Sequence, residues 1–348
     1  MRMGGQSPHQ RASAGALSSS SALGGSLDAC RRAVEGAQSV LLDCDGVLWR
    51  GDQAVDGAAA FVQSLQRNRK RVRLITNSPV KTRAAVCHKV AALLGVDVSE
   101  DEVVTSAYCA AVYLRRAIPE GSPTVVAIGE GGVLDELRAA GFRVVEAASE
   151  NDPAACPPAA FSNLPAIDGV KAVVVSLDTS FTYRALATAS LALQRNPEAA
   201  FVATNRDAAD AHAMADAKEK RRLMPGSGPI VAALEVASGR KAIDVGKGGA
   251  WFNRYVREDL LGGVHGEGEG AAVMIGDRID TDIAFGKAVG VQTVLPLSGV
   301  TQVRQRPGPA NEPTNLTDLS LFQIADVEAA PVEARPDHIV GSVKDLVL

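Results

Sequence analysis

Runs of apolar residues that fit buried strands alternate along this chain with segments of helical periodicity. Strands are expected over Val40–Cys44, Val72–Thr76, Val125–Ile128, Ala172–Leu177, Ala200–Ala203, Ala272–Ile275 and Gln292–Leu295. Helices are expected between them, over Gly57–Asn68, Lys81–Leu94, Val133–Ala140, Arg184–Gln194, Pro229–Ala237 and Thr281–Val289. Strands that are apolar without alternation are typical of a parallel sheet covered by helices on both faces. The sequence therefore predicts an α/β protein with a doubly wound parallel sheet.

Length and composition limit the classes of protein that remain. The chain has 348 residues, enough for two domains and a large core, and 46% of them are hydrophobic. The formal net charge of −4 offers no broad basic field to nucleic acid or to an acidic membrane. No apolar run is long enough to span a bilayer. We therefore expect neither a nucleic-acid partner nor a membrane partner.

The cysteines and the N-terminus bear on the cellular compartment. Five cysteines without CxxC spacing disfavour a disulfide framework and a zinc site, and favour a reducing compartment. Residues 1–27 contain no acidic residue, two arginines and seven serines, as in an organelle transit peptide. The alternative is a short disordered tail. The expected location is thus cytoplasmic, or a plastid or another organelle if residues 1–30 act as a transit peptide.

Polar side chains stand where three of these strands end and after a fourth short apolar segment near Ala242–Val245. They are Asp43 and Asp45; Thr76, Asn77 and Ser78; Lys247 in a glycine-rich turn; and Asp277 with Asp282. Parallel sheets bind ligands beyond the carboxyl ends of their strands, so these residues are expected to share one crevice. Crowded carboxylates repel each other, and a hard cation such as Mg²⁺ would relieve the repulsion. A hydroxyl, an amide and a lysine beside that cation favour a phosphate as the guest.

The spacing of Asp43 and Asp45 suits a mechanism with two carboxylates. On an extended segment both side chains point to the same side, and Cys44 points the other way. One carboxylate could attack phosphorus while the other protonates the leaving oxygen. A single aspartate after a strand is usually a turn or a helix cap, and that alternative remains for each of them taken alone.

Four motifs occur in the order that is typical of the haloacid-dehalogenase (HAD) superfamily of phosphatases. DCDGVLW from Asp43 resembles the first motif, LITNS (Leu74–Ser78) the second, VGK (Val245–Lys247) the third and IGDRIDTDI (Ile275–Ile283) the fourth. Two further pieces, VATNRD (Val202–Asp207) and PGSGPIVAALEVASGRK (Pro225–Lys241), resemble the subfamily of phosphoglycolate and p-nitrophenyl phosphatases, which includes the pyridoxal-phosphate phosphatases. The likeness covers nearly everything from about residue 37 onward.

The resemblance implies an arrangement of domains. A Rossmann-like HAD core would comprise residues 36–106 and 225–348, with residues 1–35 as a disordered or transit-like tail. A C2-type α/β cap over residues 107–224 would close over the site and exclude water. Capped members often pair through the cap, so a homodimer is expected on the same ground.

The resemblance also implies roles for the motif residues. Asp43 would be the nucleophile, forming an aspartyl-phosphate, and Asp45 would be general acid and then general base. Thr76, Asn77 and Ser78 would hold the phosphoryl oxygens, and Lys247 would neutralise charge on the phosphate and on Asp43. Mg²⁺ would be held by the Asp43 carboxylate, the Asp45 backbone carbonyl and Asp277, with Asp282 supporting the site. Arg206 and His212, which follow the strand of the VATNRD piece, are candidates for substrate recognition by the cap, or His212 is an exposed loop residue.

Two positions depart from the family's pattern. The third motif usually reads GKP, and Gly248 in place of the proline would loosen the loop behind Lys247. The second motif usually reads TNNS, whereas this chain has TNSP, so Ser78 and Pro79 stand at changed positions.

These patterns together predict a Mg²⁺-dependent phosphatase of small phosphomonoesters, with 2-phosphoglycolate as the favoured substrate. A pyridoxal-phosphate phosphatase, or a broad sugar-phosphate and p-nitrophenyl phosphatase, is the alternative on the same machinery. The alternative from a different class is a non-catalytic, phosphate-binding regulatory protein that kept the fold.

Overall fold

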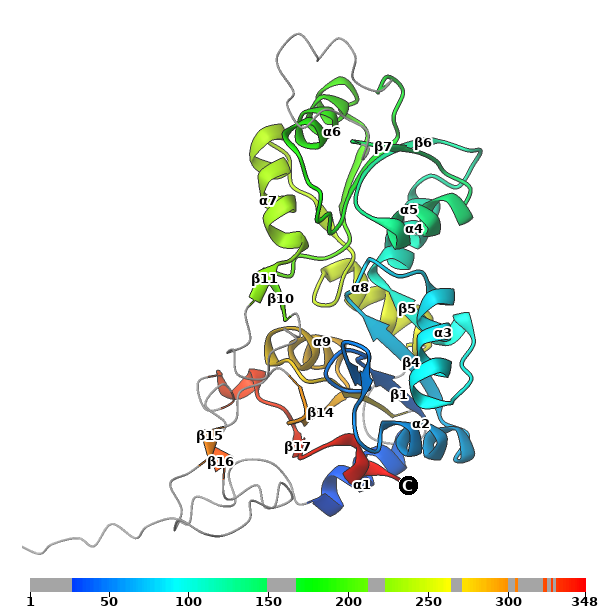
Figure 1. The fold of residues 1–348 in the computed structure, drawn as a ribbon, viewed down its shortest axis with the longest axis vertical. Helices are drawn as coiled ribbons and strands as arrows, with labels where there is room; N and C mark the ends of the chain where they lie inside the picture. Colours follow the sequence, from blue (N-terminus) through cyan, green and yellow to red (C-terminus); the bar gives the residue numbers. More distant parts are fainter. Residues whose placement is uncertain are drawn as a thin grey trace, which may run out of the picture.

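The chain forms two parallel sheets, each flanked by helices, which lie one above the other in Figure 1. The structure is a computed structural model that describes residues 27–148, 167–211, 223–263, 271–299, 304–305, 322–323, 327 and 330–348. The transit-like residues 1–26 and the candidate His212 lie outside the described residues. None of the described helices is long and apolar enough to cross a membrane.

The lower sheet in Figure 1 holds the first, second and fourth motifs. Its order is β17-β14-β13-β1-β4-β5, and all neighbouring strands are parallel. The strands are β1 (Ser39–Leu42), β4 (Arg71–Thr76), β5 (Val103–Thr105), β13 (Ala272–Ile275), β14 (Gln292–Pro296) and β17 (His338–Val340). Leu42 of β1 lies opposite both Ile275 and Leu74 in the register. The chain therefore leaves β1 and β13 at the same level, just before Asp43 and Asp277.

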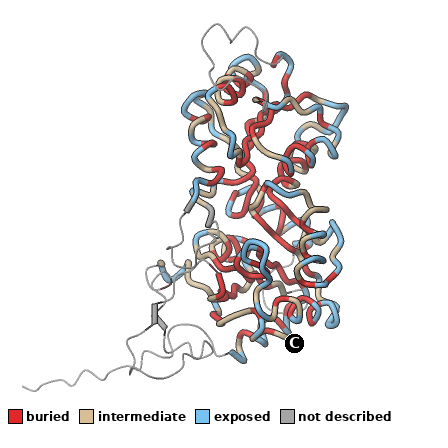
Figure 2. Tube along the Cα trace, viewed as in Figure 1, coloured by how far each residue is buried: buried red, intermediate tan, exposed pale blue. Residues whose placement is uncertain are grey.

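Helices cover both faces of this sheet. Val40 and Leu42 pack in one cluster with α1 (Leu27–Gly36), α2 (Ala58–Arg67) and α3 (Arg83–Leu94). Leu41 packs on the other face with α4 (Ser106–Ala117), α8 (Ala250–Tyr255) and α9 (Ala284–Val289). Figure 2 shows the buried residues running through the strands between these helices. Helices thus cover both faces of β1, which explains why its residues are apolar without alternation. The predicted doubly wound α/β fold is confirmed.

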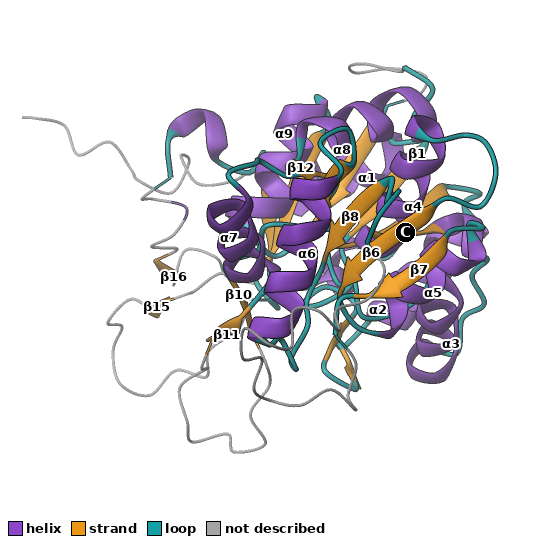
Figure 3. Ribbon diagram, turned by 90° about the horizontal axis from the view of Figure 1, so that it is seen from above, coloured by secondary structure: helices purple, strands orange, loops and turns teal. Residues whose placement is uncertain are grey.

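The upper sheet belongs to the inserted part of the chain. Its order is β12-β9-β8-β6-β7, all parallel, with strands β6 (Thr124–Ile128), β7 (Arg143–Glu146), β8 (Ala172–Val175), β9 (Ala200–Ala203) and β12 (Ile243–Asp244). Helices α6 (Tyr183–Arg195) and α7 (Ser227–Ser238) pack on one face, while α4 and α5 (Gly131–Ala139) pack on the other. Figure 3 shows these layers from above.

The upper sheet extends further along the chain than the expected cap of residues 107–224. Strand β12 pairs with β9, with Ile243 opposite Val202, and α7 packs against α6. Both elements follow residue 224, yet they complete the upper layer. We therefore propose that the inserted domain runs to about Asp244.

Six elements lie where the apolar pattern predicts none: α1, β5, α4, β7, α8 and β17. Helix α1 corrects the expectation of a tail for residues 27–35, because Cys30 and Val34 are fully buried against the lower core. The remaining strands form short pairs, β2 (Trp49–Arg50) with β3 (Gln53–Ala54), β10 (Ala209–Ala211) with β11 (Leu223–Pro225), and β15 (Arg304–Gln305) with β16 (Phe322–Gln323). Single-turn helices are η1 (Glu100–Glu102), η3 (Val256–Leu260), η4 (Ile279–Ile283), η6 (Val332–Ala334) and η7 (Val343–Leu346).

The turn between β12 and α8 carries Lys247 and is closed by hydrogen bonds. Gly248 has φ +92°, in the left-handed region that proline cannot adopt. The Gly246 N–H donates to Asp244 Oδ1 at 2.9 Å, and the Gly249 N–H donates to the Gly246 carbonyl at 3.0 Å. Glycine at this position therefore permits a hydrogen-bonded turn that proline could not adopt, and the expected loosening of the loop stays a prediction.

Gly248→Ala is expected to destabilise the fold by about 1–2 kcal/mol, the cost of a side chain in the left-handed region. The cost comes from backbone strain alone, because an added Cβ would meet nothing within 4 Å. Gly248→Pro is expected to cost more, since proline must break the turn. Urea unfolding measures both. The matched control is Gly36→Ala, which also adds a Cβ in open space but at a position without a positive φ, and it should leave the stability unchanged. Equal stability of all three variants would contradict the left-handed turn at Gly248.

Candidate active site

A cavity of about 330 Å³ lies beyond the carboxyl ends of β1, β4 and β13, below the upper sheet. It is lined by Asp43, Asp45, Gly46, Arg50, Gly51, Thr76, Asn77, Ser78, Pro79, Val80, Leu177, Asn205, Asp207, Lys247, Asp277, Arg278, Thr281, Asp282 and Gly299. All eight motif residues singled out from the sequence are in this set. The fold thus brings together the four strand ends that the sequence separates by more than 200 residues.

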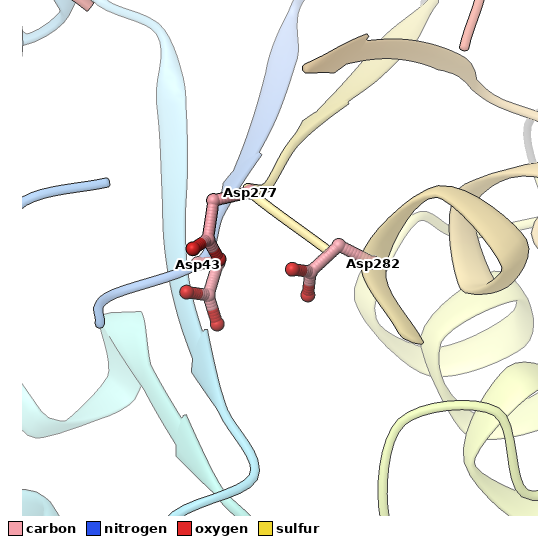
Figure 4. Close-up of side chains that lie close together, drawn as sticks. All are labelled: Asp43, Asp277 and Asp282. Atoms are coloured by element: carbon pink, nitrogen blue, oxygen red, sulfur yellow. The ribbon is translucent and has the colours of Figure 1, made fainter. Parts of the chain in front are cut away.

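Three buried carboxylates meet at the bottom of the cavity. One oxygen from each of Asp43, Asp277 and Asp282 lies within 4.8 Å of the others, and Figure 4 shows Asp43 beside Asp277 with Asp282 facing them from its helix. Their exposed fractions are 6%, 1% and 1%. Among the described residues this is the one group of such side chains placed to hold a metal ion.

Glycines leave room for two of these carboxylates. A Cβ atom added at Gly46 or Gly299 would lie about 2 Å from Oδ2 of Asp277 (2.2 and 1.9 Å). A Cβ at Gly276 would lie 2.2 Å from Cβ of Asp282. Any larger residue at these positions would displace an acidic side chain, so the glycines of DGV and IGD are needed for the geometry.

Lys247 is the buried cation of the site. Its Nζ donates to Asp43 Oδ1 and, at 2.6 Å, to Asp282 Oδ1. Three carboxylates against one ammonium leave two negative charges within this group of four residues. Buried charges need compensation, and a divalent cation held by carboxylate oxygens would supply it. The residues present therefore fit a hard divalent metal.

The electrostatics support the same conclusion. Burial raises the pKa of Asp43 well above its ordinary value, Lys247 opposes this rise, and Asp282 and Asp277 add to it. Burial acts to lower the pKa of Lys247, but Asp282 and Asp43 outweigh burial and raise that pKa above its ordinary value. The lysine is thus cationic, whereas an ionised Asp43 needs more positive charge nearby.

The side chain of Asn77 is held by both domains. Its Oδ1 accepts from the backbone N–H of Lys247 at 2.7 Å, and its Nδ2 donates to the Asp207 carboxylate at 3.1 and 3.2 Å. Its backbone carbonyl accepts from Asn205 Nδ2 at 2.9 Å and from Ser106 Oγ at 2.6 Å. Asn205 and Asp207 follow β9 of the upper sheet, so the cap reaches the second motif directly.

The segment from Asn205 to Asp207 is packed closely against three glycines. Added Cβ atoms would lie 2.7 Å from the Asn205 side chain at Gly246, 2.5 Å from the Asp207 carbonyl at Gly226, and 2.7 Å from the Arg206 carbonyl at Gly228. The backbone of this segment is thereby confined. The sequence places Asp207 in the segment where the family often recognises the substrate, but it gives neither a contact with Asn77 nor any role for Asn205, which the TNRD piece and its glycine neighbours mark.

The other expected residues divide between the cavity and the surface. Thr76 and Ser78 line the cavity, and Thr76 Oγ1 accepts from the Ser78 N–H at 3.0 Å. Asp45 is exposed and accepts from Trp49 Nε1 at 2.9 Å. Arg206 is not among the cavity residues: its guanidinium donates to Glu235 Oε1 at 2.6 Å and to the Ala242 carbonyl. Neighbouring side chains 206 and 207 point apart, so only Asp207 faces the core, and the expectation for Arg206 is corrected.

Arg278 is a second contact between core and cap that was not expected. Its guanidinium holds Asp280 through two hydrogen bonds of 3.1 and 2.8 Å and reaches the Ala209 carbonyl at 3.5 Å. Its side chain lies in the cavity wall. The fourth motif thus supplies a cation as well as carboxylates.

Two family models match separate segments of the chain. The model of haloacid dehalogenase-like hydrolases matches residues 40–143, and a HAD-hydrolase-like model matches residues 245–320. The first match runs into β6 and α5 of the upper layer, and β8, β9 and β12 lie between the two matches.

Curated relatives extend over most of the chain. Glycerol-3-phosphate phosphatase of Gallus gallus is 35% identical over 323 residues, covering 92% of this chain and 94% of that protein. Chronophin of Mus musculus is 35% identical over 272 residues, covering 77% and 84%. Phosphoglycolate phosphatase 1A, chloroplastic, of Arabidopsis thaliana is 33% identical over 279 residues, covering 80% and 74%.

Solved structures share the fold. p-Nitrophenyl phosphatase from Archaeoglobus fulgidus is 25% identical with a TM-score of 0.65, covering 89% of this chain and 98% of that one. Glycerol phosphate phosphatase Rv1692 from Mycobacterium tuberculosis in complex with magnesium is 27% identical with a TM-score of 0.63, covering 90% and 78%. On motifs, fold and relatives alike, the chain belongs to the haloacid dehalogenase-like hydrolase family, among its phosphatases.

Proposed function

We propose that this chain hydrolyses small phosphomonoesters through an aspartyl-phosphate on Asp43, with Mg²⁺ as cofactor and 2-phosphoglycolate as principal substrate. The observation that carries the proposal is the position of Asp43 at the end of β1, between the ammonium of Lys247 and the carboxylate of Asp277. A carboxylate in that place has a cation to orient it and an open cavity in front of it. Nucleophilic attack on a bound phosphorus needs both.

The proposed reaction has two steps. Asp43 attacks phosphorus, the bond to the leaving oxygen breaks, and Asp45 gives its proton to that oxygen. Water then attacks the phosphorus of the aspartyl-phosphate, Asp45 takes up the proton, and Asp43 and inorganic phosphate are released. Lys247, Thr76 and Asn77 would hold the equatorial oxygens, on which charge is spread in the transition state.

Asp43, Asp277 and Asp282 would hold the Mg²⁺, together with the backbone carbonyl of Asp45. When bound, the ion would supply charge neutralisation for the phosphoryl oxygens and for the carboxylates themselves. Rv1692 has been solved in complex with magnesium and also in complex with calcium, which supports a hard divalent cation here.

The cavity favours a small, anionic organic group. Its described lining contains no aromatic side chain against which a pyridine ring would stack, and its apolar part is Pro79, Val80 and Leu177. Arg50 and Arg278 are among the lining residues, and arginine is the residue type suited to a carboxylate, although the Arg278 guanidinium also holds Asp280. 2-Phosphoglycolate offers that carboxylate, and a phosphoglycolate phosphatase is among the relatives. The alternative is a broad phosphatase that acts on glycerol phosphate and similar esters. The relative named glycerol-3-phosphate phosphatase favours this alternative.

Release of p-nitrophenol from p-nitrophenyl phosphate is expected to stop on chelation with EDTA and to return with Mg²⁺, because the carboxylates then lose and regain their counter-ion. Asp43→Asn is expected to lower kcat by at least about 10³-fold, because the nucleophile is lost. The matched control is Asp56→Asn, which removes an exposed carboxylate paired with Lys344 and should leave kcat unchanged. Absence of hydrolysis in the unmodified protein would favour the non-catalytic, phosphate-binding alternative.

Asp207→Ala is expected to raise KM for p-nitrophenyl phosphate and the Ki of inorganic phosphate by about tenfold. A change of this size corresponds to the loss of one charge-assisted hydrogen bond. The reason is that Asn77 loses the acceptor that orients its amide. Asp207→Asn keeps an acceptor oxygen and is expected to stay within about threefold of the original values. Steady-state kinetics with phosphate inhibition tests this; equal effects of both variants would show that charge, and not the hydrogen bond, matters.

2-Phosphoglycolate is expected to show a higher kcat/KM than glycerol phosphate, pyridoxal phosphate or p-nitrophenyl phosphate. Arg50→Gln should reduce that advantage, because it removes a guanidinium near the carboxylate, and it should leave glycerol phosphate unaffected. Phosphate release from the panel measures both. Similar kcat/KM values across the panel would retain the mechanism and discard phosphoglycolate as the principal substrate.

A further inference from the structure

The indole of Trp49 holds one oxygen of Asp45. Trp49 Nε1 donates to Asp45 Oδ1 at 2.9 Å. The ring is buried, with an exposed fraction of 2%, whereas Asp45 is exposed at the cavity. A buried donor on a fixed ring thus contacts a carboxylate that would otherwise turn freely in solvent.

The backbone around this pair is closed into a tight loop. The Trp49 N–H donates to the Cys44 carbonyl at 3.2 Å, and the Gly46 N–H donates to the Trp49 carbonyl at 2.7 Å. Trp49 also pairs with Ala54 in the β2–β3 hairpin. The Cα positions of residues 45 and 49 are therefore held together by the main chain. The hydrogen bond from the indole then restricts the rotation of the Asp45 carboxylate.

The ring orientation is fixed from one face by a cation. Nζ of Lys89, on α3, lies 4.7 Å from the centroid of the Trp49 ring and 3.9 Å from the Asp52 carboxylate. A lysine in this position is attracted by the ring and resists its rotation. The direction of the indole N–H is thus set by Lys89 of α3 as well as by the hairpin.

An indole N–H can donate but cannot accept. While it donates to Oδ1, that oxygen acts as an acceptor, and an acidic proton on Asp45 is favoured at Oδ2. We propose that Trp49 is a positioning residue that turns Oδ2 of Asp45, with its proton, toward the leaving oxygen of the substrate. The inference rests on the proposed role of Asp45 as general acid. Asp45 Oδ2 gives its proton to the leaving oxygen as the bond from that oxygen to phosphorus breaks.

Leaving groups of different basicity test this role. An alkoxide such as glycerol leaves poorly without a proton, whereas p-nitrophenolate is a stable anion that leaves without one. Trp49→Phe removes the donor and keeps an aromatic ring. It is expected to lower kcat/KM for glycerol phosphate by about tenfold or more, within the 10²–10⁴ that a general acid contributes. The value for p-nitrophenyl phosphate should change by less than about threefold. We use kcat/KM because it covers the steps up to departure of the leaving group.

The chain offers a matched control in its other tryptophan. Trp251 stacks on Tyr255 with 5.1 Å between the ring centroids and packs in an apolar cluster, whereas the indole that donates to Asp45 is that of Trp49. Trp251→Phe should change kcat/KM for both esters equally. A second variant guards against misfolding: 3-benzothienylalanine at position 49 replaces the N–H with sulfur and keeps the shape of the ring. It should show the same unequal loss as Trp49→Phe.

Asp45→Asn separates failure of the inference from failure of the proposed function. An unequal loss in Asp45→Asn and in both position-49 variants supports the inference. An unequal loss in Asp45→Asn with an equal loss, or none, in the position-49 variants overturns the role of Trp49 alone. An equal loss for both esters in Asp45→Asn overturns the general-acid role on which the inference rests.

Discussion

The contact of Lys247 with Asp43 and Asp282 is the interaction on which the site depends. A buried ammonium is tolerated in a protein only when carboxylates surround it. Here Asp43 directly follows β1, and Asp282 lies in η4, which follows β13. Lys247 itself stands in the turn after β12, a strand of the upper sheet. These ionic contacts therefore tie the two sheets together at the candidate active site, and separation of the sheets would expose these charges or leave them unpaired.

The second link between the sheets runs through Asn77. Its amide is held by the main chain of Lys247 on one side and by Asp207 on the other, so the position of this side chain depends on the position of the cap. The apolar packing supports the same arrangement, because Leu41 and Ile75 of the lower sheet share one cluster with Val125 and Val174 of the upper sheet. The two sheets are thus linked both by apolar packing and by the hydrogen bonds of Asn77 beside the cavity.

Much of the site could be predicted because its residues follow strands at short, regular distances. Asp43, Thr76 and Asp277 occupy such places, and a parallel sheet must bring strand ends together. Arg206 could not be separated from Asp207 in this way, since adjacent loop residues point in different directions that only packing against Glu235 and Asn77 decides. Short elements such as β5 and β7 were missed because three or four residues carry too little periodicity.

By itself the sequence determined the alternation of apolar strands and amphipathic helices, the acidic and cationic residues at strand ends, and their order along the chain. These are local properties, set by side-chain chemistry and spacing. Only the tertiary structure decided that α1 joins the core, that β12 completes the upper sheet, and that Gly248 takes a left-handed φ in a bonded turn. It also decided which oxygen of Asp45 is held by Trp49. These features depend on contacts between distant segments, whose free energies no local pattern encodes.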